Sequence, residues 1–330
     1  MIFTRTPFRI SFAGGGSDLP DFYTRHEGCV LSTSINKYMY ISIHPTFDEK
    51  KTVIKYNKTE IVDDIRKIEH PIARQLLIDF KISGVEINSV ADVPSGMGLS
   101  TSSSYTVGLI NALNAYKGKY NSQKRMAEKA CELEIEKLGE PIGKQDQYGV
   151  AVGGMKFIRF LPSGRVEVEP IVVKNSVIKN LDESLLLFYV GMEHIAGEIL
   201  KQQQTNVREN EEKFKNTIKM TEIAWEMRDA LVLGDMEQFG KLMSSNWELK
   251  RGLSDKISNP VIEKYYNIAM SNGALGGKLL GAGGGGFLLF YCPLNKQMRL
   301  RAALHELMEL DFKIEYSGTQ VVYVGDSIFN

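Results

Sequence analysis

The 330-residue sequence contains little cysteine and no excess of charge of either sign. Its cysteines, Cys29, Cys131 and Cys292, lie far apart without any Cys-x-x-Cys pair, which argues against a disulfide framework and a structural zinc site. Lys and Arg number 40, as do Asp and Glu, so the formal net charge is zero. Because no surplus of positive charge is available to neutralise phosphates, we expect neither nucleic acid nor membrane as a partner.

Long apolar runs are also missing. The longest stretches, Leu185–Val190 and Phe287–Cys292, are far shorter than the ~20 residues that span a bilayer. A signal peptide has a basic region followed by an apolar stretch, and the first residues show no such pattern. The 43% of hydrophobic residues is ample for a core. The sequence therefore predicts a globular protein of the cytoplasm.

The order of β-rich and helix-periodic segments predicts an α+β fold. In the first half we expect strands at 8–12, 30–35, 38–43, 52–56 and 85–90, then helices at 101–116 and 122–138, then a hairpin over 155–173. In the second half we expect a strand at 185–190, helices within 193–233, a strand at 287–291, a helix near 298–310 and a strand pair at 312–316 and 320–324. The change of pattern near 175–184 predicts two domains, residues 1–178 and 179–330.

Glycines gather in clusters, and one cluster lies between a predicted strand and a predicted helix. Gly96 and Gly98 precede five consecutive hydroxyl residues, Ser100 to Ser104. A helix start of this kind binds anions through backbone amides and the partial positive charge of the helix end. A serine cap after a glycine turn is the simpler alternative, but five hydroxyls exceed what capping requires. The sequence favours phosphate binding, without a Walker motif.

A second cluster, Gly281–Gly286, formally matches the dinucleotide-binding pattern G-x-G-x-x-G. That pattern requires a helix to follow, whereas Phe287–Tyr291 reads as a strand. We therefore reject a dinucleotide site. A turn between two strands and a loop packed against the phosphate site both remain possible.

Glu134 is an isolated carboxylate on an apolar arc. At about 100° per residue it shares this arc with Ala127, Ala130 and Cys131. A buried unpaired charge is costly, so a cation, either Mg²⁺ or an arginine, is expected beside it. A structural salt bridge is an equally good explanation.

Two further charged residues are ambiguous. Asp146 lies in a segment expected to be a loop, where a turn residue is slightly favoured over a general base. Arg9 lies in an apolar strand and must pair with an acid or reach the strand end.

Three motifs in this order resemble those of the GHMP kinase superfamily: Thr6 to Asp18, Pro94 to Ser104, and Lys278 to Phe287. The resemblance covers nearly the whole chain. It implies the GHMP kinase two-domain fold, an N-terminal domain like a ribosomal-protein domain and a ferredoxin-like C-terminal domain. The active site is expected between the two domains.

The resemblance also implies roles for individual residues. Asp146 corresponds to the catalytic aspartate that accepts the proton of the attacking hydroxyl, and Arg9 to the arginine beside it. Glu134 and Ser102 correspond to ligands of Mg²⁺. The implied ATP phosphate-binding residues are Pro94, Gly96, Met97, Gly98, Leu99, Ser100, Thr101, Ser102 and Ser103. The implied substrate-binding residues are Gly15, Gly16, Ser17 and Asp18, and the implied supporting glycines are Gly281, Gly283 and Gly284.

Within the superfamily, residues 9–19 and 143–147 are most similar to kinases of a heptose phosphate. The resemblance implies ATP- and Mg²⁺-dependent phosphorylation of the anomeric hydroxyl of D-glycero-D-manno-heptose 7-phosphate, giving the 1,7-bisphosphate. The alternatives are a 1-kinase for L-fucose or galactose and a catalytically silent sugar sensor. A small sugar phosphate is the expected partner, and Lys37, Lys156 and His194 are candidate donors to its phosphate. Oligomeric state carries no signal in the sequence.

Overall fold

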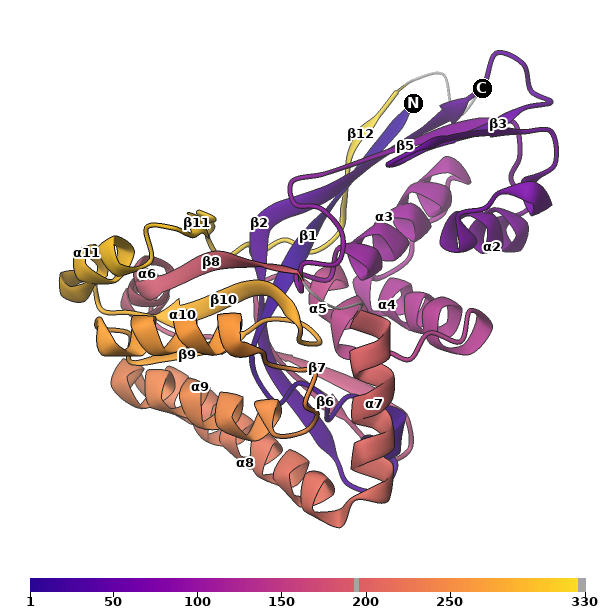
Figure 1. The fold of residues 1–330 in the computed structure, drawn as a ribbon. Helices are drawn as coiled ribbons and strands as arrows, with labels where there is room; N and C mark the ends of the chain where they lie inside the picture. Colours follow the sequence, from indigo (N-terminus) through magenta and orange to yellow (C-terminus); the bar gives the residue numbers. More distant parts are fainter. Residues whose placement is uncertain (193–195, 326–330) are drawn as a thin grey trace.

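The computed structural model describes residues 1–192 and 196–325, which form two β-sheets with helices around them (Figure 1). The first sheet is built on two long antiparallel strands, β1 (Ile2–Ala13) and β2 (Gly28–Pro45). Its order is β12-β1-β2-β5-β3-β4, and β6 and β7 join it through β2. The other strands are β3 (Thr52–Lys55), β4 (Thr59–Val62), β5 (Val85–Ala91), β6 (Met155–Phe160), β7 (Val166–Pro170) and β12 (Gln320–Val324).

β2 is one strand where the sequence predicts two. Asn36 and Lys37 look like a break, but the strand continues through them. Opposite them the register with β1 shifts between Pro7 and Phe8, so the two polar residues form a bulge. The first half of β2 pairs with β6 and the second half with β5. One strand thereby holds together both ends of the sheet.

The end of the chain returns to the first sheet. β12 pairs with β1 over Ile2–Arg5, and not with residues 312–316 as expected. Within 312–316 there is one isolated bridge, from Ile314 to Ile35, because the backbone of this stretch bonds to β2 instead of forming a hairpin. The division into residues 1–178 and 179–330 therefore does not separate the two sheets completely.

The second sheet has the ferredoxin-like topology that the resemblance implies. Its order is β11-β8-β10-β9, all antiparallel, and its chain order is βαββαβ. The predicted helix near 298–310 is α11 (Leu294–Ala303) and is followed by a short strand. The strands are β8 (Leu185–Met192), β9 (Gly276–Leu279), β10 (Gly285–Tyr291) and β11 (Met308–Glu309).

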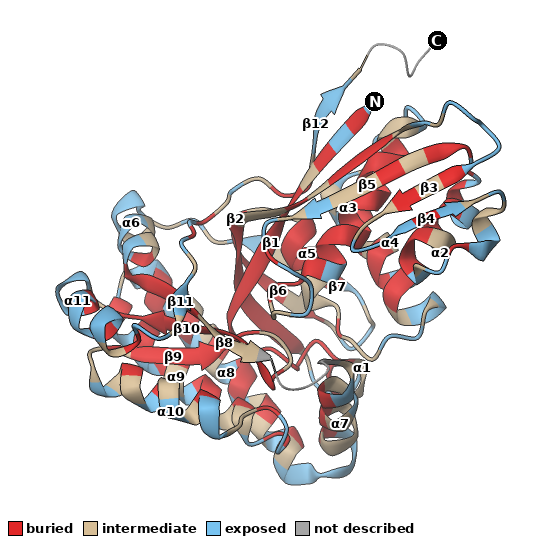
Figure 2. Ribbon diagram, turned by 45° about the horizontal axis from the view of Figure 1, so that its top comes forward, coloured by how far each residue is buried: buried red, intermediate tan, exposed pale blue. Residues whose placement is uncertain are grey.

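Two helices connect the sheets. α8 (Glu211–Leu233) begins at Asn210, whose side chain accepts from two backbone amides, and ends at Gly234 in the left-handed conformation. It packs on β1 and β2, and α9 (Met236–Arg251) packs on β9 and β1. Phe12 of β1 meets Phe239 of α9 edge to face, with ring centroids 5.2 Å apart. One buried core therefore runs through both halves (Figure 2).

The remaining helices lie around these two sheets (Figure 1). α3 packs on β1 and β2 and begins directly after the first glycine cluster. The remaining helices are α1 (Pro20–Tyr23), α2 (Pro71–Phe80), α3 (Thr101–Tyr116), α4 (Gln123–Cys131), α5 (Gln145–Ala151), α6 (Asn175–Ser184), α7 (Ala196–Glu209) and α10 (Pro260–Ser271), with single turns at Ile65–Lys67 and Glu132–Lys137.

Candidate functional site

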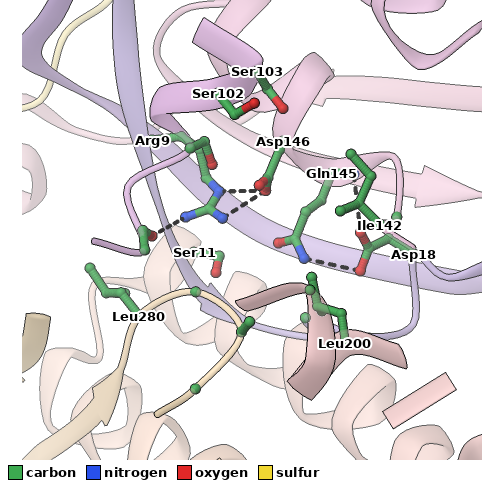
Figure 3. Close-up of a pocket in the computed structure, with 18 of the residues that line it drawn as sticks. Arg9, Ser11, Asp18, Ser102, Ser103, Ile142, Gln145, Asp146, Leu200 and Leu280 are labelled. Carbon is green, nitrogen blue, oxygen red and sulfur yellow. Dashed lines mark hydrogen bonds and ion pairs between the residues drawn. The ribbon is translucent and has the colours of Figure 1, made fainter. Parts of the chain in front are cut away.

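A cavity of about 470 Å³ lies between the two halves of the molecule, a volume typical of small-molecule sites. Its walls come from the end of β1 and the loop after it, the start of α3, the start of α5, α9, and the loop between β9 and β10. Figure 3 shows two polar pairs at this cavity, Arg9 with Asp146 and Gln145 with Asp18. Segments far apart in the sequence thus meet at one place, as the resemblance implies.

Arg9 and Asp146 form a directional ion pair in which Arg9 is buried and Asp146 is partly exposed. Both Nε and Nη2 of Arg9 donate to the same carboxylate oxygen, Oδ1, at 2.9 and 2.6 Å. Nη1 donates to the carbonyl of Gly98 at 3.0 Å, which ties the pair to the first glycine cluster. The second carboxylate oxygen, Oδ2, accepts no hydrogen bond from the part of the chain that the structure describes. One oxygen is therefore fixed, and the other is available to a ligand.

Asp146 lies in the first turn of a helix, α5, and not in a loop as expected. Lys156 stabilises the carboxyl end of this short helix, because its Nζ donates to the carbonyl of Gly149 at 2.9 Å. A cation at the carboxyl end of a helix complements its dipole. Lys156 is fully buried and does not line the cavity, and Lys37 does not line it either. The third candidate for a substrate phosphate, His194, lies outside the described residues.

The loop before α3 and the first residues of α3, together residues 94–103 (the phosphate loop), are shaped to present N–H groups. Gly98 and Ser100 have φ values of +83° and +63°. A left-handed serine is unusual, and here it turns the chain directly into the first turn of α3. The amides of a first helical turn have no partner within the helix. The Ser100 hydroxyl is also buried without a partner among the described residues. The loop therefore offers several donors to an anion.

The second glycine cluster packs directly against the phosphate loop, as one of the two interpretations of the sequence requires. A Cβ on Gly281 would lie 2.6 Å from Gly98 Cα, and a Cβ on Gly98 would lie 2.6 Å from the Leu280 carbonyl oxygen. Both approaches involve backbone atoms, so no side-chain rearrangement relieves them. Gly283 likewise abuts the backbone of Ile257. The two loops need glycine because they touch.

Glu134 is 1% exposed, which confirms the burial predicted from its arc. It lies on a turn of π-helix, Glu132–Lys137, a local widening that is frequent at functional sites. Oε1 accepts from Thr106 Oγ1 at 2.8 Å and Oε2 from Gln147 Nε2 at 2.7 Å; Ser102 and Ser103 contribute longer bonds. No arginine or lysine of the described residues pairs with it, so the salt-bridge explanation is wrong.

This carboxylate suits a metal ion held together with phosphates. Burial raises the pKa of Glu134 to about 7, and the nearby Asp146 acts in the same direction. Carboxylate and hydroxyl oxygens are the ligands that Mg²⁺ prefers, and Mg²⁺ usually takes only one or two carboxylates besides substrate phosphates. Glu134 and Ser102 both line the cavity beside the phosphate loop. The donor set therefore fits Mg²⁺.

The loop after β1, residues 14–18 (the sugar loop), is held by its own side chains. Asp18 Oδ1 accepts from the Gly16 amide and from Gln145 Nε2 at 2.9 and 3.0 Å. Burial raises the pKa of Asp18, and Asp146 adds to the effect. The Ser17 hydroxyl points inward and donates to the carbonyls of Gly14 and Cys29. Ser17 thus shapes the loop and, contrary to expectation, does not face the cavity.

Most of the expected site residues line the cavity, but not all. Besides Ser17, the exceptions are Pro94, Met97, Leu99 and Gly284. Leu99 is fully buried in the core, and its carbonyl accepts from the Arg9 amide at 3.3 Å. Met97 supports the second glycine loop, since a Cβ on Gly286 would lie 2.6 Å from its carbonyl oxygen. These residues shape the loops and present no side chain to a ligand.

The polar residues of the cavity that were missed include Asn246, Lys250 and Lys278. For Asn246 and Lys250, the spacing of residues along the sequence did indicate burial. Phe239, Met243, Asn246 and Lys250 recur every three or four residues on the buried face of α9, the same pattern that identified Glu134. Lys278 lies in a four-residue strand that is buried throughout.

Family models agree with this architecture. The GHMP kinases N terminal domain matches residues 65–154, and the GHMP kinases C terminal domain matches residues 227–310. The chain belongs to the GHMP kinases. It is therefore a kinase, and ATP is the phosphate donor in this family.

Relatives in the family act on sugars. The chain is 30% identical to the D-glycero-alpha-D-manno-heptose 7-phosphate kinase of Campylobacter jejuni over 92% of this chain and 93% of that protein. It is 26% identical to the galactokinase of Pyrococcus furiosus over 96% of each chain. A crystal structure described as a D-glycero-D-manno-heptose 1-phosphate kinase from Bacteroides thetaiotaomicron shares the fold, with a TM-score of 0.81 over 99% of this chain and all of that one, at 23% identity. These relatives make the chain a sugar kinase of this family.

Among the described residues, none of the helices combines the length and the apolar character needed to cross a membrane.

Proposed function

We propose that this kinase transfers the γ-phosphoryl group of ATP to the anomeric hydroxyl of D-glycero-D-manno-heptose 7-phosphate. The observation that carries the proposal is that Asp146 lines the cavity together with the phosphate loop and the sugar loop, and that Arg9 occupies only its Oδ1, which leaves Oδ2 without a partner among the described residues. An acceptor hydroxyl held by the sugar loop and a nucleotide held by the phosphate loop would meet at this oxygen.

Asp146 accepts the proton of the acceptor hydroxyl at Oδ2. The hydroxyl oxygen then forms a bond to the γ-phosphorus, and the bond from that phosphorus to the bridging oxygen of ADP breaks. Arg9 orients Asp146 through Oδ1, at 2.6 and 2.9 Å, and its positive charge lies beside the transferring group. Phosphoryl transfer depends mainly on such positioning and charge neutralisation, so no covalent intermediate is required.

The phosphate loop, with the Ser100 hydroxyl and the amides of the first turn of α3, binds the phosphates of ATP. Glu134 and Ser102 would hold Mg²⁺, which would supply positive charge to the phosphates of the nucleotide. Asp18, fixed by Gln145, binds hydroxyl groups of the sugar.

The choice of sugar rests on two supports. The relative at 30% identity is named for the 7-phosphate of this heptose, and it matches over nearly the full length of both chains. The cavity also contains two buried lysines, which favour an acceptor with negative charge. A galactokinase matches at lower identity, which makes a free-sugar 1-kinase the second candidate.

Product analysis tests this proposal. The protein is incubated with ATP, Mg²⁺ and the heptose 7-phosphate, and the product is followed by ³¹P NMR. We expect a new resonance coupled to the anomeric proton, together with the unchanged 7-phosphate. A new phosphate at another carbon, or no product with this sugar but a 1-phosphate from galactose or L-fucose, would contradict the proposal.

A further inference from the structure

Two buried ammonium groups have no role in the transfer steps above. Lys278 Nζ donates to the Ser11 carbonyl, and Lys250 Nζ to Gln203 Oε1, both at 2.7 Å. Neither lysine forms an ion pair with a carboxylate of the described residues. Both line the cavity, although they are only 5% and 7% exposed. Buried charges without a counter-ion are unfavourable, so an anionic ligand would stabilise them.

Asn246 adds a donor to the same wall. Its Oδ1 accepts from the Gly14 amide at 3.1 Å, and it is 1% exposed. Since the Gly14 amide can only donate, the orientation of the side-chain amide is fixed, and Nδ2 is its free end. Nδ2 has no partner among the described residues. A buried N–H without a partner, on a residue that lines the cavity, points to an acceptor on the ligand.

These donors form a row that starts near the catalytic pair. Arg9, Ser11, Gly14 and Gly16 follow one another along β1 and the sugar loop. Lys278 donates to the carbonyl of Ser11, and Asn246 accepts from the amide of Gly14. Lys250 Nζ lies close to Gly16, 3.5 Å from the position that a Cβ on this glycine would take. Asn246 and Lys250 are one turn apart on α9. The row therefore leads from the reacting end of the cavity to the sugar loop.

Neither aspartate near this row is paired with Lys250 or Lys278. Asp146 Oδ1 is taken by Arg9, and Asp18 is held by the Gly16 amide and by Gln145. Burial lowers the pKa of Lys250 to about 8, while Asp18 acts in the opposite direction. Burial, with Lys250 and Arg9 nearby, places the pKa of Lys278 well below its usual value. A bound anion would restore both charges.

We propose that Lys250, Lys278 and Asn246 bind the phosphate that the acceptor sugar already carries, at a second anion site separate from the phosphate loop. This inference rests on the proposed function and assigns residues to its substrate specificity. Because the row follows β1 and the sugar loop and its side chains are distinct from Asp146, it selects a sugar that carries a phosphate in addition to the reacting hydroxyl. A seven-carbon sugar phosphorylated at C7 and attacked through its anomeric hydroxyl has this arrangement.

The test compares two acceptors, the heptose 7-phosphate and the free heptose, in the full-length protein. Lys250→Met retains side-chain length and removes the charge. We expect kcat/KM for the phosphorylated sugar to fall by about 10²-fold, the scale of one or two charge-assisted hydrogen bonds. We expect kcat/KM for the free heptose and KM for ATP to change by less than about threefold.

A second variant keeps the test decisive if Lys250→Met does not fold. Asn246→Asp keeps an oxygen for the Gly14 amide but replaces the free N–H₂ by a negatively charged oxygen. It should show the same selective loss. Lys241→Met is the matched control, because Lys241 is an exposed lysine of the same helix that pairs with Glu237. It should behave as the wild type, and thermal unfolding verifies that each variant is folded.

The outcomes separate the two proposals. A wild type that turns over no phosphorylated heptose contradicts the proposed function, and the second anion site fails with it. A wild type that prefers the phosphorylated sugar, together with variants that keep this preference, leaves the function intact and overturns the site. Equal losses on both sugars also overturn it, because the residues would then serve folding or the transfer step.

Discussion

Asp146 and Arg9 are 137 residues apart in the chain and share a single carboxylate oxygen. This arrangement decides which oxygen is free to accept a proton. Asp146→Asn keeps the acceptor for the two Arg9 donors but removes the basic oxygen. We predict that kcat falls by ~10²-fold or more, the usual scale for a lost general base, with little change in ATP affinity.

The measurement is steady-state kinetics combined with nucleotide titration. Asp79→Asn is a suitable control, since Asp79 forms a 2.8 Å ion pair with Lys137 at the surface. A near-normal kcat in Asp146→Asn would exclude this residue as the proton acceptor.

Glu134 carries the second prediction at this scale. Glu134→Gln relieves a buried charge, and the hydroxyls of Ser102 and Thr106 can turn to accept from the new amide. We predict a folded protein that needs at least about tenfold more Mg²⁺ for half-maximal activity, because a carboxylate ligand is lost.

Mg²⁺ titration of activity and thermal unfolding measure the two effects. Glu128→Gln, on the neighbouring helix α4 and outside the cavity, serves as the control. An unfolded variant, or a folded one with an unchanged Mg²⁺ response, would make Glu134 a structural residue.

At the scale of elements, two glycine loops depend on their close approach. Gly98→Ala would bring a Cβ within 2.6 Å of the Leu280 carbonyl oxygen at a φ of +83°. We predict that the loops separate and that kcat/KM for ATP falls by at least about tenfold.

Gly139→Ala isolates the backbone strain. Gly139 has a φ of +69° but no atom within 4 Å of an added Cβ. It should lose only about 1 kcal/mol of stability and keep its activity, since left-handed backbone alone costs roughly this much. Equal activities of the two variants would show that contact between the loops is not needed.

Lys156 supports the helix that carries Asp146, and its burial predicts a pH dependence. Burial lowers the pKa of Lys156 to about 7, and Arg9 adds to this effect. Above this pH the folded state binds fewer protons than the unfolded chain, whose lysines titrate near 10.4, so folding stability rises between about pH 7 and 10. Below pH 7 the buried Lys156 is charged in the folded state, so the full cost of burying this charge lowers the folding stability.

Lys156→Met removes this contribution. Chemical denaturation at pH 6.5 and pH 9 should show a smaller gain in stability with pH for the variant than for the wild type. Identical pH dependences would mean that Lys156 does not titrate in this range.

Local sequence patterns predict some features of the site, and others depend on how distant elements pack. The burial of Glu134 follows from local periodicity, and the shape of the phosphate loop follows from Gly98 and the serines after it. The pairing of Arg9 with Asp146 could not be derived from spacing, because it depends on how β1 and α5 pack. Lys278 was not found either, since a lysine in a short apolar strand gives no periodic signal.

At the scale of the molecule, both sheets contribute to one cavity. β1 and α3 bring the transfer chemistry, and α9 and β9 bring the cationic wall. α9 packs against strands of both sheets, and α8 packs against α9 and the first sheet, so the two helices fix the two walls relative to each other (Figure 1). The two proposals therefore assign the transfer chemistry and the selection of the acceptor to different parts of the fold.

The central claim is that the acceptor sugar already carries a phosphate. The most direct measurement is kcat/KM of the wild type for heptose 7-phosphate, free heptose, L-fucose and galactose under the same conditions. Charge-assisted hydrogen bonds to the sugar phosphate predict a preference for heptose 7-phosphate over the free sugar of ~10²-fold or more. Equal or better turnover of any of the unphosphorylated sugars would contradict the claim.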